Sequence, residues 1–173
     1  MNIIEYTRNL EKEEKNLEQL EHSTEIEDLS VGIRRDIAKS KVLTGIDVSN
    51  ATVENLQGNT AGLYYLGQNR IKIDKGILDS GDEKARLQVL VHESMHQVND
   101  SRSNGVRIID TDFLESMNEL ATERRTGEFL AENANKSDAE KIASKVGKSV
   151  QAIIDMYEEG RNTELNEYYS KAS

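Results

Sequence analysis

Ten residues in the middle of the chain, Val89 to Val98, place two histidines four residues apart in an apolar segment. The segment reads Val-Leu-Val-His-Glu-Ser-Met-His-Gln-Val, and it holds two of the three histidines of the 173-residue chain. On an α-helix, residues i and i+4 lie one turn apart on the same face, so His92 and His96 can point at one metal ion. Glu93 then lies on the adjoining face. This His-Glu-x-x-His pattern is typical of sites in which two histidines hold Zn²⁺ and the glutamate is the general base.

The residue types in this pattern suit hydrolytic chemistry. Neutral imidazole is a good zinc ligand, and zinc with an open coordination position lowers the pKa of a bound water towards neutrality. A carboxylate at position 93 can accept the proton of that water during attack on a carbonyl and pass it to the leaving amine. Glutamine at this position could form a hydrogen bond but could not accept the proton. The alternative is that the two histidines flank a buried core, so the rest of the sequence has to decide.

Short segments before the motif have the patterns of β-strands. Residues 62–66 and 70–74 are separated by Gly67-Gln68-Asn69, whose residue types favour a tight hairpin turn. The second segment alternates isoleucine with charged residues, which indicates a strand with one buried face. Residues 52–56 are a weaker strand candidate. The sequence therefore predicts a β-hairpin just before the segment that carries the histidines.

Helical patterns make up most of the remaining chain. Apolar residues recur at helical spacing over residues 3–20, 26–37 and 142–157. The histidine helix can begin at Ser80 or Asp82 and run to about Asn99, because short polar residues cap the exposed N–H groups of a helix start. The predicted fold class is therefore α+β, mostly helical, with a small antiparallel or mixed sheet.

A further amphipathic helix is predicted after the histidine helix. It covers residues 111–123, with Thr111 as its cap and an apolar inner face. Beyond it, the polar stretch 133–137 is the best domain boundary. We therefore predict a domain of residues 1–133 and a C-terminal helical subdomain of residues 134–173.

The composition limits the classes of binding partner and the cellular compartment that we expect. The chain has 22 Lys and Arg against 32 Asp and Glu, a net charge of −10, so nucleic acid and anionic membrane surfaces would be repelled. It has no cysteine, which excludes disulfides, thiolate metal ligands and a thiol nucleophile. No signal peptide or membrane-spanning run is visible. The expectation is a soluble protein that is cytoplasmic at synthesis, with delivery to another cell as an effector left open.

Two histidines leave one protein ligand to be found, because catalytic zinc usually has three. The third histidine, His22, lies far upstream in a polar turn, and neither the glycine nor the histidine of a metzincin follows His96. The third ligand should therefore be a carboxylate. Helix 111–123 supplies three candidates at intervals of one turn: Glu115, Glu119 and Glu123.

The order of the motifs resembles that of a known family. Residues 92–96, followed by Asn-Glu-x-x-Thr-Glu at residues 118–123, are similar to the gluzincin pattern of thermolysin-type metallopeptidases, where Asn-Glu-x-x-Ser-Asp on a following helix gives the third ligand. The resemblance covers residues 45–130. It implies a zincin-like fold with an active-site helix and a glutamate helix. It also implies Glu119 as the third Zn²⁺ ligand and Glu123 as an acid that accepts a hydrogen bond from a ligand histidine.

The same resemblance implies a zinc metallopeptidase acting on a peptide or protein substrate. The predicted hairpin would correspond to the zincin sheet, whose edge strand lies along the cleft and pairs with an extended peptide. The implied site has Glu93 as the catalytic base, His92, His96 and Glu119 as metal ligands, and Gly62, Leu63, Tyr64 and Tyr65 as substrate-binding residues.

Two other functions fit the same residues. One is a zinc-dependent amidase or deamidase that acts on a non-peptide bond, and the other is a non-catalytic protein-binding module, such as a toxin or effector domain. Thermolysin-type enzymes also use a tyrosine and a further histidine to stabilise the oxyanion, and no downstream histidine exists in this chain. The candidates for that role are Tyr157, Tyr168, Tyr169, Arg124 and Arg125.

Overall fold

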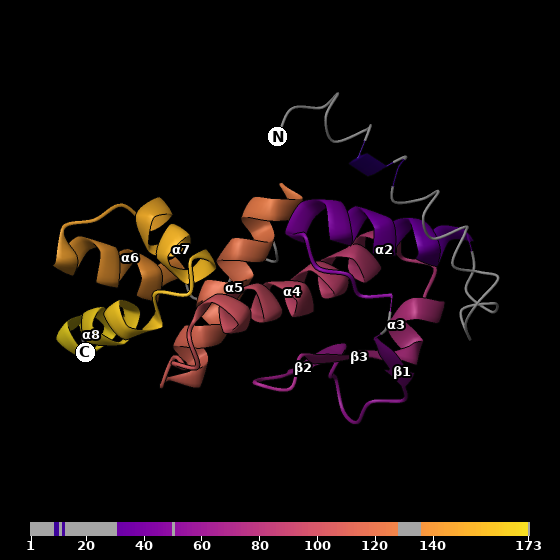
Figure 1. Cartoon of the computed structure of the whole chain (residues 1–173), viewed down its shortest axis with the longest axis horizontal. Coiled ribbons are helices and arrows are strands. Elements are labelled where there is room, and N and C mark those ends of the chain that lie inside the picture. Colours follow the sequence, from indigo (N-terminus) through magenta and orange to yellow (C-terminus); the bar gives the residue numbers. More distant parts are fainter. Residues whose placement is uncertain (1–8, 11, 13–30, 50, 128–135, 173) are drawn as a thin grey trace. The chain divides into compact units, whose positions relative to one another are not determined.

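The protein is an α+β structure, mostly helical, with one small mixed sheet, as the sequence predicts (Figure 1). The computed structural model describes residues 9, 10, 12, 31–49, 51–127 and 136–172. These residues form two compact units. The first comprises the residues up to Tyr64 together with Arg70–Ser94, and the second comprises Tyr65–Asn69 and the residues from Met95 onward.

The sheet has three strands, and its central strand is the last in the chain. Strands β1 (Thr52–Glu54), β2 (Gly62–Tyr65) and β3 (Arg70–Asp74) are ordered β1-β3-β2. β1 is parallel to β3, and β2 joins β3 through the hairpin turn, which makes the sheet mixed. Ile71 and Ile73 of β3 are buried while the residues between and beside them are more exposed. The predicted hairpin and its one buried face are therefore confirmed, and β2 is an edge strand of this sheet.

The hairpin turn uses left-handed backbone at two residues. Gly67 has φ 74° and Asn69 has φ 52°, the region that glycine and asparagine tolerate best. The amide of Gln68 closes the turn by donating to the Tyr65 carbonyl at 3.0 Å. The residue types at 67–69 thus explain why the chain reverses here.

The first unit packs helices around the first half of the histidine helix. Figure 1 shows α2 (Val31–Thr44) and the sheet on opposite sides of that half of α4 (Glu83–Arg102). Between α2 and α4, Arg86 Nε donates to Asp36 Oδ2 at 2.7 Å, and the Ser40 and Ser94 hydroxyls lie 3.4 Å apart, all in buried positions. These polar pairs supplement the apolar contacts of α2.

A short helix, α3 (Lys75–Asp79), follows β3 and was not predicted. Its cap is Asp74, whose carboxylate accepts hydrogen bonds from the amides of Gly76 and Ile77 and, through its other oxygen, from the amide of Leu56. A five-residue helix shows too little periodicity to be found from sequence.

Helix α4 begins as predicted and extends further than predicted. Asp82 caps it, since the Ala85 amide donates to Asp82 Oδ1 at 3.0 Å, whereas Ser80 closes α3 instead. The helix continues to Arg102, beyond the predicted end at Asn99. Asn99 lies inside the helix, and its side chain, 3 % exposed, forms tertiary hydrogen bonds.

The second unit contains the rest of α4 and four further helices: α5 (Thr111–Thr126), α6 (Lys136–Val146), α7 (Val150–Glu158) and α8 (Asn162–Ala172). The predicted cap Thr111 is wrong. The preceding residue, Asp110, is extended and accepts from the Phe113 amide at 2.8 Å, so it takes the cap role. The predicted inner face of α5 is confirmed, because the following residues are all buried: Phe113, Leu114, Met117, Leu120 and Ala121.

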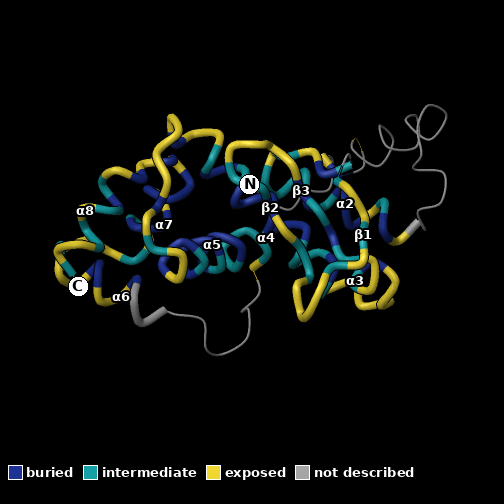
Figure 2. The backbone as a smooth tube through the Cα atoms, turned by 90° about the horizontal axis from the view of Figure 1, so that it is seen from below, coloured by how far each residue is buried: buried dark blue, intermediate teal, exposed yellow. Residues whose placement is uncertain are grey.

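The C-terminal helices enclose a core of their own, seen as dark blue segments in Figure 2. Ile153, Tyr157 and Leu165 are fully buried within it. The helical pattern of residues 142–157 is divided between α6 and α7, and Ser149 caps the start of α7 by accepting from the Ala152 amide. No helix in the described part of the chain is both long enough and apolar enough to cross a membrane.

Some predictions fall outside the described residues. These are most of the helix predicted over residues 3–20, the start of the helix predicted over residues 26–37, and the domain boundary between residues 133 and 134.

Candidate metal centre

Helix α4 carries the His-Glu-x-x-His motif at a largely buried position. His96 is 7 % exposed and Glu93 5 %, while His92 is half-buried. Met95 and Val91, on the packed side of the helix, are fully buried and fix its rotation. Because α4 is one continuous helix, His92 and His96 lie one turn apart on the same side of it, as the spacing predicts.

A carboxylate of α5 joins the two histidines. Glu115 Oε2 lies 3.4 Å from His96 Nε2. One ligand atom from each of His92, His96 and Glu115 lies within 4.8 Å of the other two, which makes this a group able to hold a metal ion. The side chain of Glu115 is 44 % exposed, so water can reach this end of the group.

The spacing of two of these ligand atoms is compatible with a tetrahedral metal ion such as zinc. Two ligands at zinc bond lengths, seen from a tetrahedral metal, are separated by about 3.4 Å. The distance between His96 Nε2 and Glu115 Oε2 has this value. Two imidazoles and one carboxylate are donors that zinc accepts, and three protein ligands would leave a fourth position open. Closing the widest spacing in the group, up to 4.8 Å, requires side-chain shifts of roughly 1 Å.

The group contains Glu115, the rival ligand, and does not contain Glu119. Glu119 is half-buried, lies one turn further along α5, and has interactions of its own. Residues 115 and 119 share one face of the helix, so sequence spacing alone does not say which turn of α5 lies beside His96. This group therefore supports Glu115 rather than Glu119 as the carboxylate beside the histidines, and the predicted role of Glu123 stays a prediction.

The predicted base, Glu93, lies against the edge strand of the sheet. A Cβ atom built on Gly62 would come within 2.6 Å of Glu93 Oε1 and 2.7 Å of Glu93 Cγ. The backbone of β2 thus passes directly beside this carboxylate. Of the other predicted substrate-binding residues on β2, Leu63 is 39 % exposed, Tyr64 is buried and Tyr65 is half-buried.

Three contacts in the second unit anchor the hairpin turn, and the sequence reasoning missed all of them. The Gly67 amide donates to Asp100 Oδ2 at 2.6 Å, and Gln97 of α4 donates to the Asn69 side chain. Arg107 donates to the Leu66 carbonyl at 3.3 Å. Single polar residues of this kind carry no periodic signal, so nothing in the sequence marked them. Together they hold the hairpin turn to the second half of α4 and to the loop that follows α4.

Most of the candidates for oxyanion stabilisation are used elsewhere. Tyr157 is fully buried, and its hydroxyl donates to Asn118 Oδ1 at 2.8 Å. The ring of Tyr169 stacks on Phe113 with 4.9 Å between centroids. Tyr168 lies half-buried on α8, beside two lysines whose Nζ atoms are 5.9 Å from its ring.

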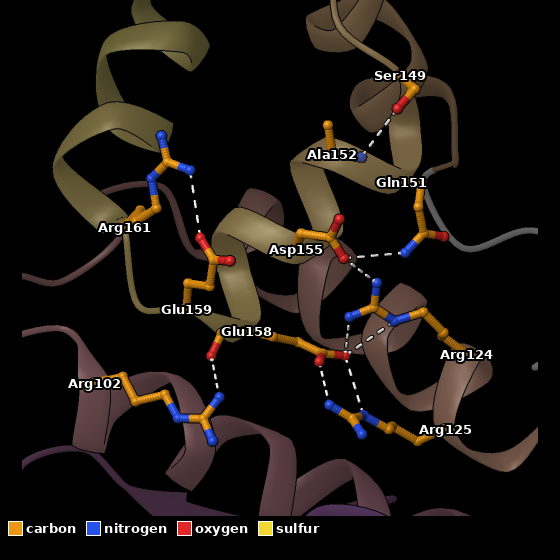
Figure 3. A network of polar contacts seen from close by, with 10 residues as sticks. All are labelled: Arg102, Arg124, Arg125, Ser149, Gln151, Ala152, Asp155, Glu158, Glu159 and Arg161. Carbon is orange, nitrogen blue, oxygen red and sulfur yellow. Dashed lines mark hydrogen bonds and ion pairs between the residues drawn. The ribbon is translucent and has the colours of Figure 1, made fainter. Parts of the chain in front are cut away.

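The two arginines of α5 are held by carboxylates of α7 (Figure 3). Arg124 and Arg125 each donate to Glu158, a buried residue, through Nε at 3.1 and 3.2 Å. Arg124 also donates to Asp155 at 2.5 Å, and this hydrogen bond lowers the pKa of Asp155. The network therefore fixes α5 against α7 and leaves both guanidinium groups engaged.

Comparison of the whole chain with protein-family models, with curated proteins and with solved structures finds no match in any of the three sets.

Proposed function

We propose that the protein is a zinc-dependent metallopeptidase whose metal ligands are His92, His96 and Glu115. The observation that carries this proposal is the group of two helical histidines and one carboxylate, with His96 and Glu115 at the separation of two zinc ligands. The buried carboxylate of Glu93 immediately follows the first histidine, which is the position that the motif requires of a general base.

In the proposed reaction, the bound metal ion and Glu93 have separate roles. A zinc ion, when bound, supplies a Lewis acid that polarises the substrate carbonyl and makes water acidic near neutral pH. Glu93 accepts a proton as the water oxygen adds to the carbonyl carbon. As the carbon–nitrogen bond breaks, Glu93 returns that proton to the departing amine. Its burial, at 5 % exposure, keeps competing water away from the proton.

Strand β2 supports the choice of a peptide substrate. It is an edge strand of the sheet in the described part of the chain, and it runs beside Glu93 at Gly62. An extended peptide can add to such an edge through main-chain hydrogen bonds. On this proposal, residues 62–65 present the substrate main chain next to the base.

Metal analysis of four proteins tests the ligand assignment: the wild type, His96→Ala, Glu115→Ala and Glu119→Ala. We expect one zinc per chain in the wild type and in Glu119→Ala, and loss of zinc in the other two. Glu119→Ala is the matched control, because it removes the same carboxylate one turn away on the same helix. Retention of zinc by Glu115→Ala together with its loss from Glu119→Ala would reverse the assignment, and a wild type without zinc affinity would refute the metal centre.

A peptide library read by mass spectrometry tests the reaction itself. Cleavage should create new peptide termini, whereas an amidase or deamidase would release ammonia or a small amine without cutting the chain. Glu93→Gln should retain zinc and lose turnover, because the amide cannot accept a proton. Peptide cleavage by Glu93→Gln at the wild-type rate would exclude Glu93 as the base.

A further inference from the structure

Gly62 lies so close to Glu93, the proposed catalytic base, that a side chain at position 62 would clash with it. A Cβ atom at this position would lie 2.6 Å from Oε1, 2.7 Å from Cγ and 2.9 Å from Cδ of Glu93. Separations under about 3 Å are shorter than carbon contacts in proteins allow. The close approach involves the middle of the Glu93 side chain as well as its end, so a rotation of the carboxylate alone does not relieve it.

The backbone does not explain the glycine. Gly62 is absent from the positive-φ glycines of the described residues, so its conformation is open to any amino acid. Gly58, the preceding glycine, shows the contrast, since it has φ 69° and open space around its Cβ position. A glycine inside a strand weakens the strand and commonly marks a close approach of another group. Space for Glu93 is the feature at this position that accounts for it.

We propose that Gly62 is a positioning residue for Glu93. The missing side chain lets the Glu93 carboxylate lie against the backbone of β2, at the edge where a peptide would be presented. Any larger residue at position 62 displaces the base while leaving the three metal ligands in place. The catalytic part of this inference rests on the proposed function, whereas the steric part concerns the folded chain alone.

A double-mutant cycle tests the steric part without any activity measurement. Gly62→Ala should lower the equilibrium constant for folding of the full-length chain on the order of tenfold to a hundredfold, the range of overpacking in a filled site. In a Glu93→Ala background, Gly62→Ala should change the equilibrium constant for folding by less than about threefold, because the Glu93 atoms that the added Cβ would contact are absent. Leu63→Ala is the matched control. Its side chain points to the opposite face of the strand, so its effect should be equal in both backgrounds.

The catalytic part is tested on zinc-loaded protein. Gly62→Ala should keep one zinc per chain, lower kcat for a cleaved peptide at least tenfold, and shift the acidic limb of the pH profile of kcat.

The outcomes separate the inference from the proposed function. Equal effects of Gly62→Ala with and without the Glu93 side chain, or failure of Gly62→Ala to fold in the Glu93→Ala background, would overturn the inference. Coupling in the folding cycle without any peptidase activity would instead refute the proposed function and leave the steric contact standing.

Discussion

Replacing Tyr157 by phenylalanine tests whether this tyrosine serves the fold or the reaction. The Tyr157 hydroxyl is fully buried and donates to Asn118 Oδ1 at 2.8 Å, and Asn118 is itself fully buried. Removal of the hydroxyl eliminates this hydrogen bond, and the buried Asn118 Oδ1 atom loses its donor from Tyr157. Such a loss costs about 1 kcal/mol when the acceptor finds compensation and up to about 3 kcal/mol when it does not. For a chain of this size, each kcal/mol lowers Tm by roughly 2–4 °C.

Urea unfolding followed by circular dichroism measures this loss, and kcat per folded molecule measures the reaction. We expect Tyr157→Phe to lower the free energy of unfolding while zinc content and kcat stay at wild-type values, because the hydroxyl is committed to Asn118. Tyr168→Phe is the control, since Tyr168 lies half-buried on α8 and its substitution should stay within about 0.5 kcal/mol of the wild type. Unchanged stability of Tyr157→Phe, or a hundredfold fall in kcat with the fold intact, would contradict the assignment.

Three further perturbations have defined outcomes. Gly160→Ala should cost about 2–5 kcal/mol in urea unfolding, because Gly160 has φ 71° and an added Cβ would meet the backbone of Arg102; a loss under 0.5 kcal/mol would show that this contact is relaxed. The hydrogen bond from Arg124 lowers the pKa of Asp155 in the folded protein below its unfolded value of 3.8. The free energy of unfolding of the wild type should therefore exceed that of Asp155→Asn above pH 3.8, and the difference should disappear as pH falls through the folded pKa. That advantage stays under about 1 kcal/mol for a half-exposed pair, and a difference independent of pH would contradict it. Zinc at a hundred times its Kd should stabilise the protein by about 2.7 kcal/mol in a thermal scan; a chelator should reverse the gain, and His96→Ala should not show it.

Periodicity in the sequence predicts the elements that are long or alternating. The one buried face of β3 and the inner face of α5 both follow from the spacing of apolar residues, and the structure confirms each of them. The helix α3 and the cap at Asp110 were missed for a common reason. Each depends on one carboxylate that binds nearby amides, and several neighbouring polar residues could do the same.

The candidate site also has one part that the sequence pattern predicts and one part that it does not. The spacing of His92 and His96 is a property of one helix, so the sequence predicts their common direction. Which carboxylate of α5 lies beside His96 depends on how far α5 is displaced along its axis, and a displacement of one turn would exchange Glu115 for Glu119 without changing the buried face. The contacts of Asp100 and Arg107 with the hairpin turn were likewise not predicted, because single polar residues leave no periodic pattern.

The buried asparagine pair of the second unit bears on how the chain can be shortened. Asn99 of α4 and Asn162 of α8 exchange hydrogen bonds at 2.8 and 2.9 Å, and Asn99 also donates to the Tyr157 carbonyl. Deleting the chain beyond Tyr157 would remove Asn162 and leave the buried amide of Asn99, on the helix that bears the histidines, without this hydrogen-bond partner. The last helix is therefore part of the buried packing of that unit, and a shortened chain made to test the proposed metal centre should retain it.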